Sequence, residues 1–350
     1  MAKKLKTIDN QFTIPSNWYF KKDFLDKEKK EIFLKEWQLI GSRSQIKNPG
    51  QVLVAEVANN PIIITCQEDN TLKAFYNVCQ HRGGPLAYEN CSVNKLQCKY
   101  HGWVYELDGK LKNARGFKDS ELNIEDYGLT AISVTEWMGQ VFVSLSKKPN
   151  ELNQHIDKIK SLISPIDFSN YTFKFRESYE INCNWKVYMD NFLEGFHIPF
   201  VHPELNKVID YKSYKTEIYD RFSVQWCPLD SELSPYGKSD NPQQNKAFYF
   251  TIYPNIILNI APGRLQTNIV EPKGPKDCVV HFDYHFDNPK KANIEQDVEF
   301  SEMVQQEDVL ICESVQKGLE SEGYDKGKFS PLNEQGVFHF QSLVKSSLNL

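Results

Sequence analysis

Residues 76–105, YNVCQHRGGPLAYENCSVNKLQCKYHGWVY, contain the most informative pattern of this 350-residue chain. Cys79 and His81 form a C-x-H pair, and after sixteen residues Cys98 and His101 form a C-x-x-H pair. Each half offers one thiolate and one imidazole, so two such loops that face each other can share the ligation of two metal atoms. Glycines beside both pairs suit tight loops whose backbone N–H groups approach a bound group. The pattern therefore predicts two facing metal-binding loops.

Two cysteines and two histidines are the ligands of a Rieske [2Fe–2S] cluster, in which two histidines replace two cysteines on one of the irons. A zinc site can use the same atoms, but it usually takes both cysteines from one half and both histidines from the other. Unrelated core cysteines and chance histidines are a third interpretation. The spacing and the glycine-rich flanks favour a Rieske cluster held by Cys79, His81, Cys98 and His101.

Length and composition limit the other possibilities. One cluster needs only about a hundred residues of protein, so a chain of 350 residues has room for a further domain. A net charge of −5 predicts no nucleic-acid partner and no anionic-membrane surface. An apolar run of about eighteen residues is missing, so no membrane span is expected. The other cysteines follow no disulfide pattern, which predicts a reducing, cytoplasmic location.

Hydrophobic periodicity predicts an α+β protein with three segments. Residues 1–44 are expected to form a helical segment that packs on the C-terminal domain, and residues 45–145 an all-β domain that contains both cluster loops. Residues 146–350 are expected to form a catalytic domain that ends in a long helix, from about 293 to 318. Its predicted strands cover 173–181, 247–253, 256–260, 266–271 and 279–286.

A second group of possible ligands lies in NWKVYMDNFLEGFHIPFVHP, residues 184–203. Asp190, Glu194 and His197 fall on one face at helical spacing, and a proline then separates His197 from His202. Two imidazoles on either side of a helix break can meet at one metal. With a carboxylate from elsewhere they would form the facial triad of non-haem Fe(II) oxygenases. A pair of hydrogen-bonded core histidines is the alternative.

Asp308 in the C-terminal helix is the candidate for that carboxylate. It lies within a predicted apolar stripe, where an ionised carboxylate costs several kcal/mol unless it is paired or bound to a metal. The neighbouring Glu307 is also acidic, but the helical phase favours Asp308. A buried aspartate that is only hydrogen-bonded is the alternative. The predicted stripe consists of Ile294, Val298, Val304, Ile311, Val315 and Leu319.

With these motifs the chain resembles the α-subunits of Rieske non-haem iron oxygenases over nearly its whole length. The resemblance rests on CQHRGGP and CKYHGW in the cluster loops, on the spacing of Asp190, Glu194, His197 and His202, and on Asp308. It implies an N-terminal Rieske domain and a catalytic domain of the helix-grip (START-like) type, in which an antiparallel sheet grips the long C-terminal helix. It also implies a mononuclear Fe(II) held by His197, His202 and Asp308.

The resemblance further implies how electrons would move. A separate NAD(P)H-dependent reductase of the flavin or ferredoxin type would reduce the cluster, since no G-x-G-x-x-G dinucleotide fingerprint is evident in the chain. In a head-to-tail homotrimer the electron would then cross a subunit interface to the mononuclear iron. Glu194 would bridge His101 and His197, and Asp190 is counted with it among the catalytic residues.

Glu194 also bears on the substrate, because most ring-hydroxylating members have aspartate at this position. In this respect the chain resembles the branch that hydroxylates or dealkylates quaternary ammonium compounds such as carnitine, glycine betaine or choline. Ring hydroxylation or O-demethylation of an aromatic compound is the alternative, and an electron-transfer protein without catalysis is a third. Aromatic residues that could surround a trimethylammonium group are Phe200, Trp226, Phe248, Tyr249, Phe250 and Tyr253.

Overall fold

The computed structural model describes residues 8, 11–118, 122–229, 241, 244–288 and 293–350. The chain divides into two compact units, one of Phe33–Asn150 and the other of Met1–Ile32 together with Glu151–Leu350. None of the helices in these described residues is long and apolar enough to cross a membrane.

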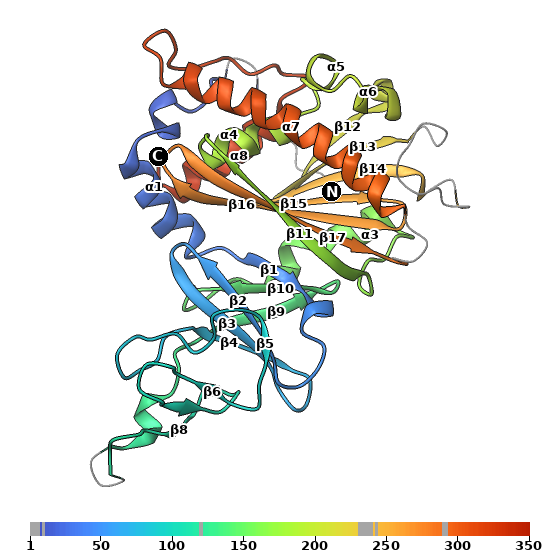
Figure 1. The fold of residues 1–350 in the computed structure, drawn as a ribbon. Helices are drawn as coiled ribbons and strands as arrows, with labels where there is room; N and C mark the ends of the chain where they lie inside the picture. The colour runs from blue at the N-terminus through green and yellow to red at the C-terminus, as the bar shows by residue number, and fades with distance from the viewer. Residues whose placement is uncertain (1–7, 9–10, 119–121, 230–240, 242–243, 289–292) are drawn as a thin grey trace. The chain divides into compact units, whose positions relative to one another are not determined.

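The Phe33–Asn150 unit is built from β-strands, which confirms the predicted all-β character of the N-terminal domain (Figure 1). Its larger sheet has seven antiparallel strands in the order β1-β10-β9-β4-β3-β2-β5. These are β1 (Gln38–Ser42), β2 (Gln51–Val57), β3 (Asn60–Cys66), β4 (Leu72–Tyr76), β5 (Cys91–Ser92), β9 (Ala131–Trp137) and β10 (Gln140–Ser144). The smaller sheet consists of β6 (Leu96–Gln97), β7 (Val104–Tyr105) and β8 (Leu111–Asn113).

One strand of this unit departs from the sequence-based expectation. Residues up to 40 have a helical pattern, yet Gln38–Ser42 forms β1 and pairs with β10. The pairing partner lies about a hundred residues further along the chain, so local periodicity could not indicate it. Two short 3₁₀ turns, Arg43–Gln45 and Ile124–Tyr127, complete the unit.

The second unit contains a seven-stranded antiparallel sheet in the order β11-β17-β16-β15-β14-β13-β12. Its strands are β11 (Thr172–Ile181), β12 (Lys215–Ile218), β13 (Phe222–Pro228), β14 (Lys246–Ile252), β15 (Ile256–Ala261), β16 (Arg264–Gly274) and β17 (Asp277–Phe286). Its helices are α1 (Lys22–Glu28), α2 (Leu152–Ile156), α3 (Lys158–Ile163), α4 (Trp185–Phe192), α5 (Ile198–Val201), α6 (Leu205–Val208), α7 (Ile294–Leu319) and α8 (Gln335–Ser347). Shorter helical turns cover Ser16–Tyr19, Lys29–Phe33 and Tyr211–Ser213.

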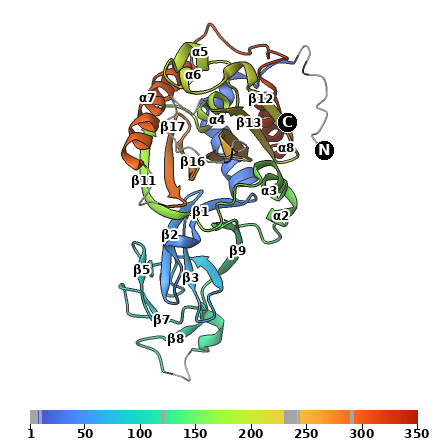
Figure 2. The ribbon, with the colours of Figure 1, turned by 90° about the vertical axis from the view of Figure 1, so that its right-hand side faces the viewer.

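Helix α4 lies against the sheet and contacts both α7 and α8 (Figures 1 and 2). It begins where the Asn184 side chain accepts a hydrogen bond from the Lys186 N–H, a usual N-terminal cap. The long α7, orange-red in Figure 1, confirms the predicted C-terminal helix. The chain therefore has the α+β architecture that the resemblance implied.

Of the apolar stripe predicted for α7, only Leu319 is buried. The fully buried positions of the helix are mostly polar, and Val315 of the predicted stripe is 44% exposed. The polar groups can be buried because partners satisfy them: Asp297 pairs with Arg264, and the Gln316 side chain accepts the Asn184 N–H. The buried residues of α7 are Asp297, Ser301, Gln305, Cys312, Gln316 and Leu319.

A buried ion pair joins the N-terminal helix α1 to α4. Lys186 Nζ lies 2.7 Å from Glu28 Oε1, and neither side chain has solvent exposure. Trp185 Nε1 donates to the other Glu28 oxygen at 2.8 Å. Burial lowers the pKa of Lys186, while the charge of Glu28 opposes that shift. Because an unpaired charge in this position would be costly, the pair fixes α4 against α1.

Candidate metal centres and active site

The two cysteine–histidine loops have the same backbone geometry. In the first loop the Gly83 N–H donates to the Cys79 carbonyl at 2.9 Å, and the Cys79 N–H donates to the Gly84 carbonyl at 2.8 Å. In the second loop the Gly102 N–H donates to the Cys98 carbonyl at 2.9 Å. The Cys98 N–H donates to the Trp103 carbonyl at 2.9 Å, which is again the carbonyl five residues ahead of the cysteine. Gly83 and Gly102 have φ of 73° and 78°, a region that favours glycine.

The side chains of these loops fit a [2Fe–2S] cluster. Cys79 and Cys98 are 2% exposed, and the rings of His81 and His101 lie 4.6 Å apart between centroids. His81 Nδ1 is buried without a hydrogen-bond partner among the described residues, which is unusual unless the atom is a metal ligand. A Cβ atom on Gly84 would lie 3.0 Å from Cys98 Sγ, so glycine keeps this space open.

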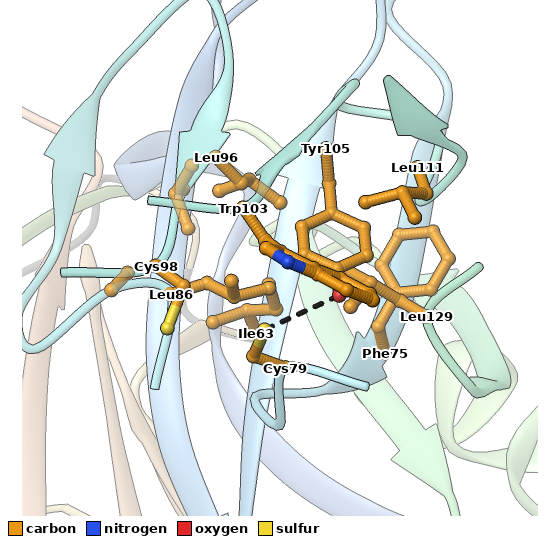
Figure 3. Packing of buried hydrophobic residues seen from close by; sticks show 12 residues of the cluster. Ile63, Phe75, Cys79, Leu86, Leu96, Cys98, Trp103, Tyr105, Leu111 and Leu129 are labelled. Atoms are coloured by element: carbon orange, nitrogen blue, oxygen red, sulfur yellow. Dashed lines mark hydrogen bonds between the residues drawn. The ribbon is translucent and has the colours of Figure 1, made fainter. Parts of the chain in front are cut away.

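Tyr105 and Trp103 support the cluster loops from the protein core (Figure 3). The Tyr105 hydroxyl lies 3.3 Å from Cys79 Sγ and accepts the Gln80 N–H at 3.0 Å. Burial raises the pKa of Tyr105, so its hydroxyl stays protonated and can donate to a Cys79 thiolate. Trp103 stacks on His81 with 4.9 Å between ring centroids. Both residues lie in the quoted stretch, but their spacing alone did not indicate these roles.

Three predicted ligands come together in the catalytic unit. His197 and His202 lie at the two ends of α5, and Asp308 projects from α7. The distances are 3.2 Å between the two Nε2 atoms, 3.0 Å from His202 Nε2 to Asp308 Oδ1, and 3.8 Å from His197 Nε2 to that oxygen. Ligands at right angles around a metal with bonds of about 2.1 Å are separated by about 3 Å. Two of the three separations match this value and the third, at 3.8 Å, is wider, so the three atoms are close enough together to hold one metal as a facial triad would.

A carboxylate holds the second ring nitrogen of each histidine. Glu194 Oε1 lies 2.8 Å from His197 Nδ1, and Glu307 Oε2 lies 2.7 Å from His202 Nδ1. Each pair favours the tautomer with the proton on Nδ1, which leaves Nε2 free to bind a metal. Burial acts to lower the pKa of His202, but Asp308 and Glu307 outweigh it and raise that pKa. The sequence does not predict the contact between Glu307 and His202, because the two residues are more than a hundred positions apart.

Asp190 does not lie with these residues. Its carboxylate accepts hydrogen bonds from the Tyr19 hydroxyl at 2.6 Å and from Gln341 Nε2 at 2.9 Å. Burial raises the pKa of Asp190 to about 7. The next residue, Asn191, does reach the site, where its Nδ2 donates to Asp308 Oδ1 at 2.7 Å. Asp190, Glu194 and His197 do not share one helical face, because α4 ends at Phe192, and Asp190 belongs to a buried network instead.

A cavity of about 720 Å³, open solvent at its mouth included, lies beside the histidines. Of the aromatic residues named from the sequence, only Tyr249 lines it; Phe200, for example, is 84% exposed. Alternation along β14 explains part of the difference, because Phe248 and Phe250 point to the opposite face from Tyr249. The aromatic residues that line the cavity are Tyr188, Phe192, Tyr214, Tyr249 and Phe282. The amide residues are Asn191, Gln225, Asn259, Gln266, Asn268 and Gln305.

One chain thus combines a fold and donor set for a Rieske cluster with a second donor set for one iron, the combination that defines a Rieske-type oxygenase. The family model described as "Rieske [2Fe-2S] domain" matches residues 36–127, and "Ring hydroxylating alpha subunit (catalytic domain)" matches residues 168–349. The chain belongs to the Rieske non-haem iron oxygenases, as its motifs indicated. It is an oxygenase component whose cofactors are a Rieske [2Fe–2S] cluster and a mononuclear iron.

Similar proteins extend along the whole chain. A chloroplastic choline monooxygenase of Arabidopsis thaliana is 32% identical and covers 98% of this chain and 84% of its own length. The oxygenase subunit of a carnitine monooxygenase of Acinetobacter pittii is 28% identical, with coverage of 96% and 95%. The crystal structure of the quaternary ammonium Rieske monooxygenase CntA with L-carnitine superimposes with a TM-score of 0.86 at 25% identity and covers 99% of each chain.

The Glu307 contact yields a prediction about metal retention. Glu307→Gln should weaken binding of the mononuclear iron by roughly 10- to 100-fold, because the amide holds the Nδ1–H of His202 less strongly than a carboxylate does. The cluster spectrum should not change. Iron binding is measured by titration of iron-depleted protein under anaerobic conditions. Glu299→Gln removes the same charge from an exposed position of α7 and serves as the control. Equal iron affinity in both variants would show that Glu307 does not support the site.

Proposed function

We propose that this chain is the oxygenase component of a monooxygenase that acts on a small quaternary ammonium compound. A separate NAD(P)H-dependent reductase supplies the electrons, and the substrate is hydroxylated at a carbon next to nitrogen. The aminoalcohol formed then breaks its C–N bond to release a dealkylated amine and an aldehyde. The reaction consumes one O₂, two electrons and two protons, and one oxygen atom leaves as water.

The charge of the cavity carries the substrate part of this proposal. Its lining includes the carboxylates of Glu194 and Asp308 together with several aromatic rings. Arg264 is the cation among the described lining residues, and Asp297 neutralises it at 2.8 Å. Asp308 is assigned to the iron, so a substrate cation would be attracted by the Glu194 carboxylate and by the aromatic faces. The names of the choline and carnitine monooxygenases among its relatives support the same class.

The ligand assignment completes the proposal. Cys79, His81, Cys98 and His101 hold the cluster, and His197, His202 and Asp308 hold the mononuclear iron. When bound, this iron supplies the activation of O₂ that organic side chains cannot provide. The protein contributes a buried pocket for the substrate and fixed orientations for both imidazoles.

Glu194 is the residue proposed to connect the two centres. One carboxylate oxygen holds His197 Nδ1–H, and the other accepts the backbone N–H groups of His197 at 3.1 Å and of Phe196. In a head-to-tail homotrimer, as in the family, this carboxylate would also accept a hydrogen bond from His101 of a neighbouring subunit. The path between centres would then run through one carboxylate and two imidazoles.

Turnover measurements test the substrate class. Holoenzyme with a surrogate reductase should consume NADH and O₂ when choline, glycine betaine or carnitine is added, and it should release an aldehyde. Aromatic carboxylates and methoxybenzoates form the comparison set. Hydroxylation or O-demethylation of that set, with no product from any amine, would favour the aromatic alternative. A cluster that is reduced normally while neither set is oxidised would favour an electron-transfer protein.

Glu194→Gln tests the proposed bridge. Both metals should remain bound, because Glu194 is not a ligand in this scheme, and the reductase should still reduce the cluster. Electron transfer to the mononuclear iron should slow by roughly 100-fold, since an amide cannot hold two imidazole N–H groups as a carboxylate does. Single-turnover reoxidation of a pre-reduced cluster measures this step. Glu204→Gln, at an exposed position, is the control. Reoxidation of the Glu194→Gln cluster at the wild-type rate would rule out the bridge.

A further inference from the structure

Three polar residues of β16 form a row along one wall of the cavity. Arg264, Gln266 and Asn268 alternate along the strand, so their side chains share one face of the sheet. Arg264 Nη2 donates to Gln266 Oε1, and Gln266 Nε2 donates to Asn268 Oδ1 at 3.0 Å. Each hydrogen bond is thus donated in the same direction along the strand, towards Asn268.

The guanidinium fixes the orientation of both amides. Arginine can only donate hydrogen bonds, so the Gln266 oxygen must face Arg264 and the Gln266 NH₂ must face Asn268. The Asn268 oxygen then accepts, and its NH₂ group is the free end of the row. Asn268 is 2% exposed, and its Nδ2 has no hydrogen-bond partner within the described parts of the chain.

A second amide of the cavity also has a free donor, and in this case the donor atom itself is buried. Gln305 is 2% exposed and lies one turn before Asp308 on α7. Its Oε1 accepts the Tyr188 hydroxyl at 2.7 Å, and its Nε2 is buried without a hydrogen-bond partner in the described structure. Unpaired buried donors are destabilising, and proteins rarely retain them without a ligand or water to accept the bond.

The free donors are suited to oxygen and not to an ammonium group. An N–H carries partial positive charge, which repels a cation, and a trimethylammonium group has no lone pair to accept a hydrogen bond. Asp297 balances the charge of Arg264, so the row presents aligned donors with little net charge. Donors that are linked in series also strengthen one another.

We infer that the row Arg264–Gln266–Asn268, with Gln305, binds a hydroxyl or carboxylate oxygen at the end of the substrate away from its ammonium group. This inference rests on the proposed function and extends it. Asn268 donates to the substrate oxygen, and the ammonium group lies towards Glu194, Asp308 and the aromatic rings. Asn268 is then a specificity-determining residue, and an amine without the oxygen binds poorly.

Binding of matched ligands to the anaerobic holoenzyme tests this inference. Isothermal titration compares choline with ethyltrimethylammonium, which differs only in lacking the hydroxyl, and glycine betaine represents the carboxylate. Wild-type protein should bind at least one of the two oxygen-bearing ligands about tenfold more tightly than ethyltrimethylammonium. The comparison of choline with glycine betaine distinguishes the hydroxyl from the carboxylate as the favoured group.

Asn268→Asp is the informative variant, because it keeps the acceptor for Gln266 and removes the free donor. It should abolish a preference for glycine betaine, whose carboxylate can only accept, and leave the affinity for ethyltrimethylammonium unchanged or higher. A choline hydroxyl can donate to the new carboxylate, so for choline the deciding variant is Asn268→Ala. Asn268→Ala removes the donor without adding a charge and should also abolish the preference. Asn170→Asp adds the same charge at an exposed position, and this control variant should keep the binding preference of the wild-type protein. Retained iron and cluster absorbance verify that each variant is folded.

The outcomes separate this inference from the proposed function. Equal wild-type binding of choline, glycine betaine and ethyltrimethylammonium overturns the oxygen site, even if quaternary amines are turned over. A preference that survives both Asn268 variants overturns it as well. Tight, Asn268-dependent binding without turnover of any amine retains the oxygen site and overturns the proposed reaction. If neither these three ligands nor carnitine binds, both are overturned.

Discussion

The buried polar face of α7 is the constraint on which the catalytic unit depends. A helix face that carries Asp297, Ser301, Gln305 and Asp308 can be buried only if the surrounding elements supply partners. The sheet supplies Arg264 and Gln266, and α4 supplies Tyr188 and Asn191. The same requirement that holds α7 in place therefore brings donors and acceptors to one cavity. The polar contacts that stabilise α7 in the fold are therefore the same contacts that position the side chains of the cavity.

The two metal centres depend on local and on long-range geometry to different degrees. The cluster loops are two short turns with the same hydrogen bonds, each closed by a glycine with positive φ. The mononuclear site instead joins α5 to α7, more than a hundred residues later in the chain. Its histidines are held by Glu194 and Glu307, so each ring has its second nitrogen occupied. A preformed arrangement of this kind needs little rearrangement when a metal binds.

Local patterns explain which features the sequence could predict. The Cys79–His81 and Cys98–His101 spacings reflect loop geometry within a few residues, and the α+β architecture follows from strand and helix periodicity. The stripe on α7 failed because periodicity assumes that a buried face is apolar, whereas this one is polar and paired across the fold. The grouping of Asp190 with the site failed for a related reason, since its partners Tyr19 and Gln341 come from both ends of the chain.

Metal and sulfide analysis of the purified protein shows whether one chain carries both centres in the residues named. We expect about three irons and two acid-labile sulfides per chain, with the EPR signal of a reduced Rieske cluster. Asp308→Ala should lower the iron content by about one while the sulfide and the EPR signal persist. Zinc in place of iron, absence of the Rieske signal, or an unchanged iron content in Asp308→Ala would contradict the account.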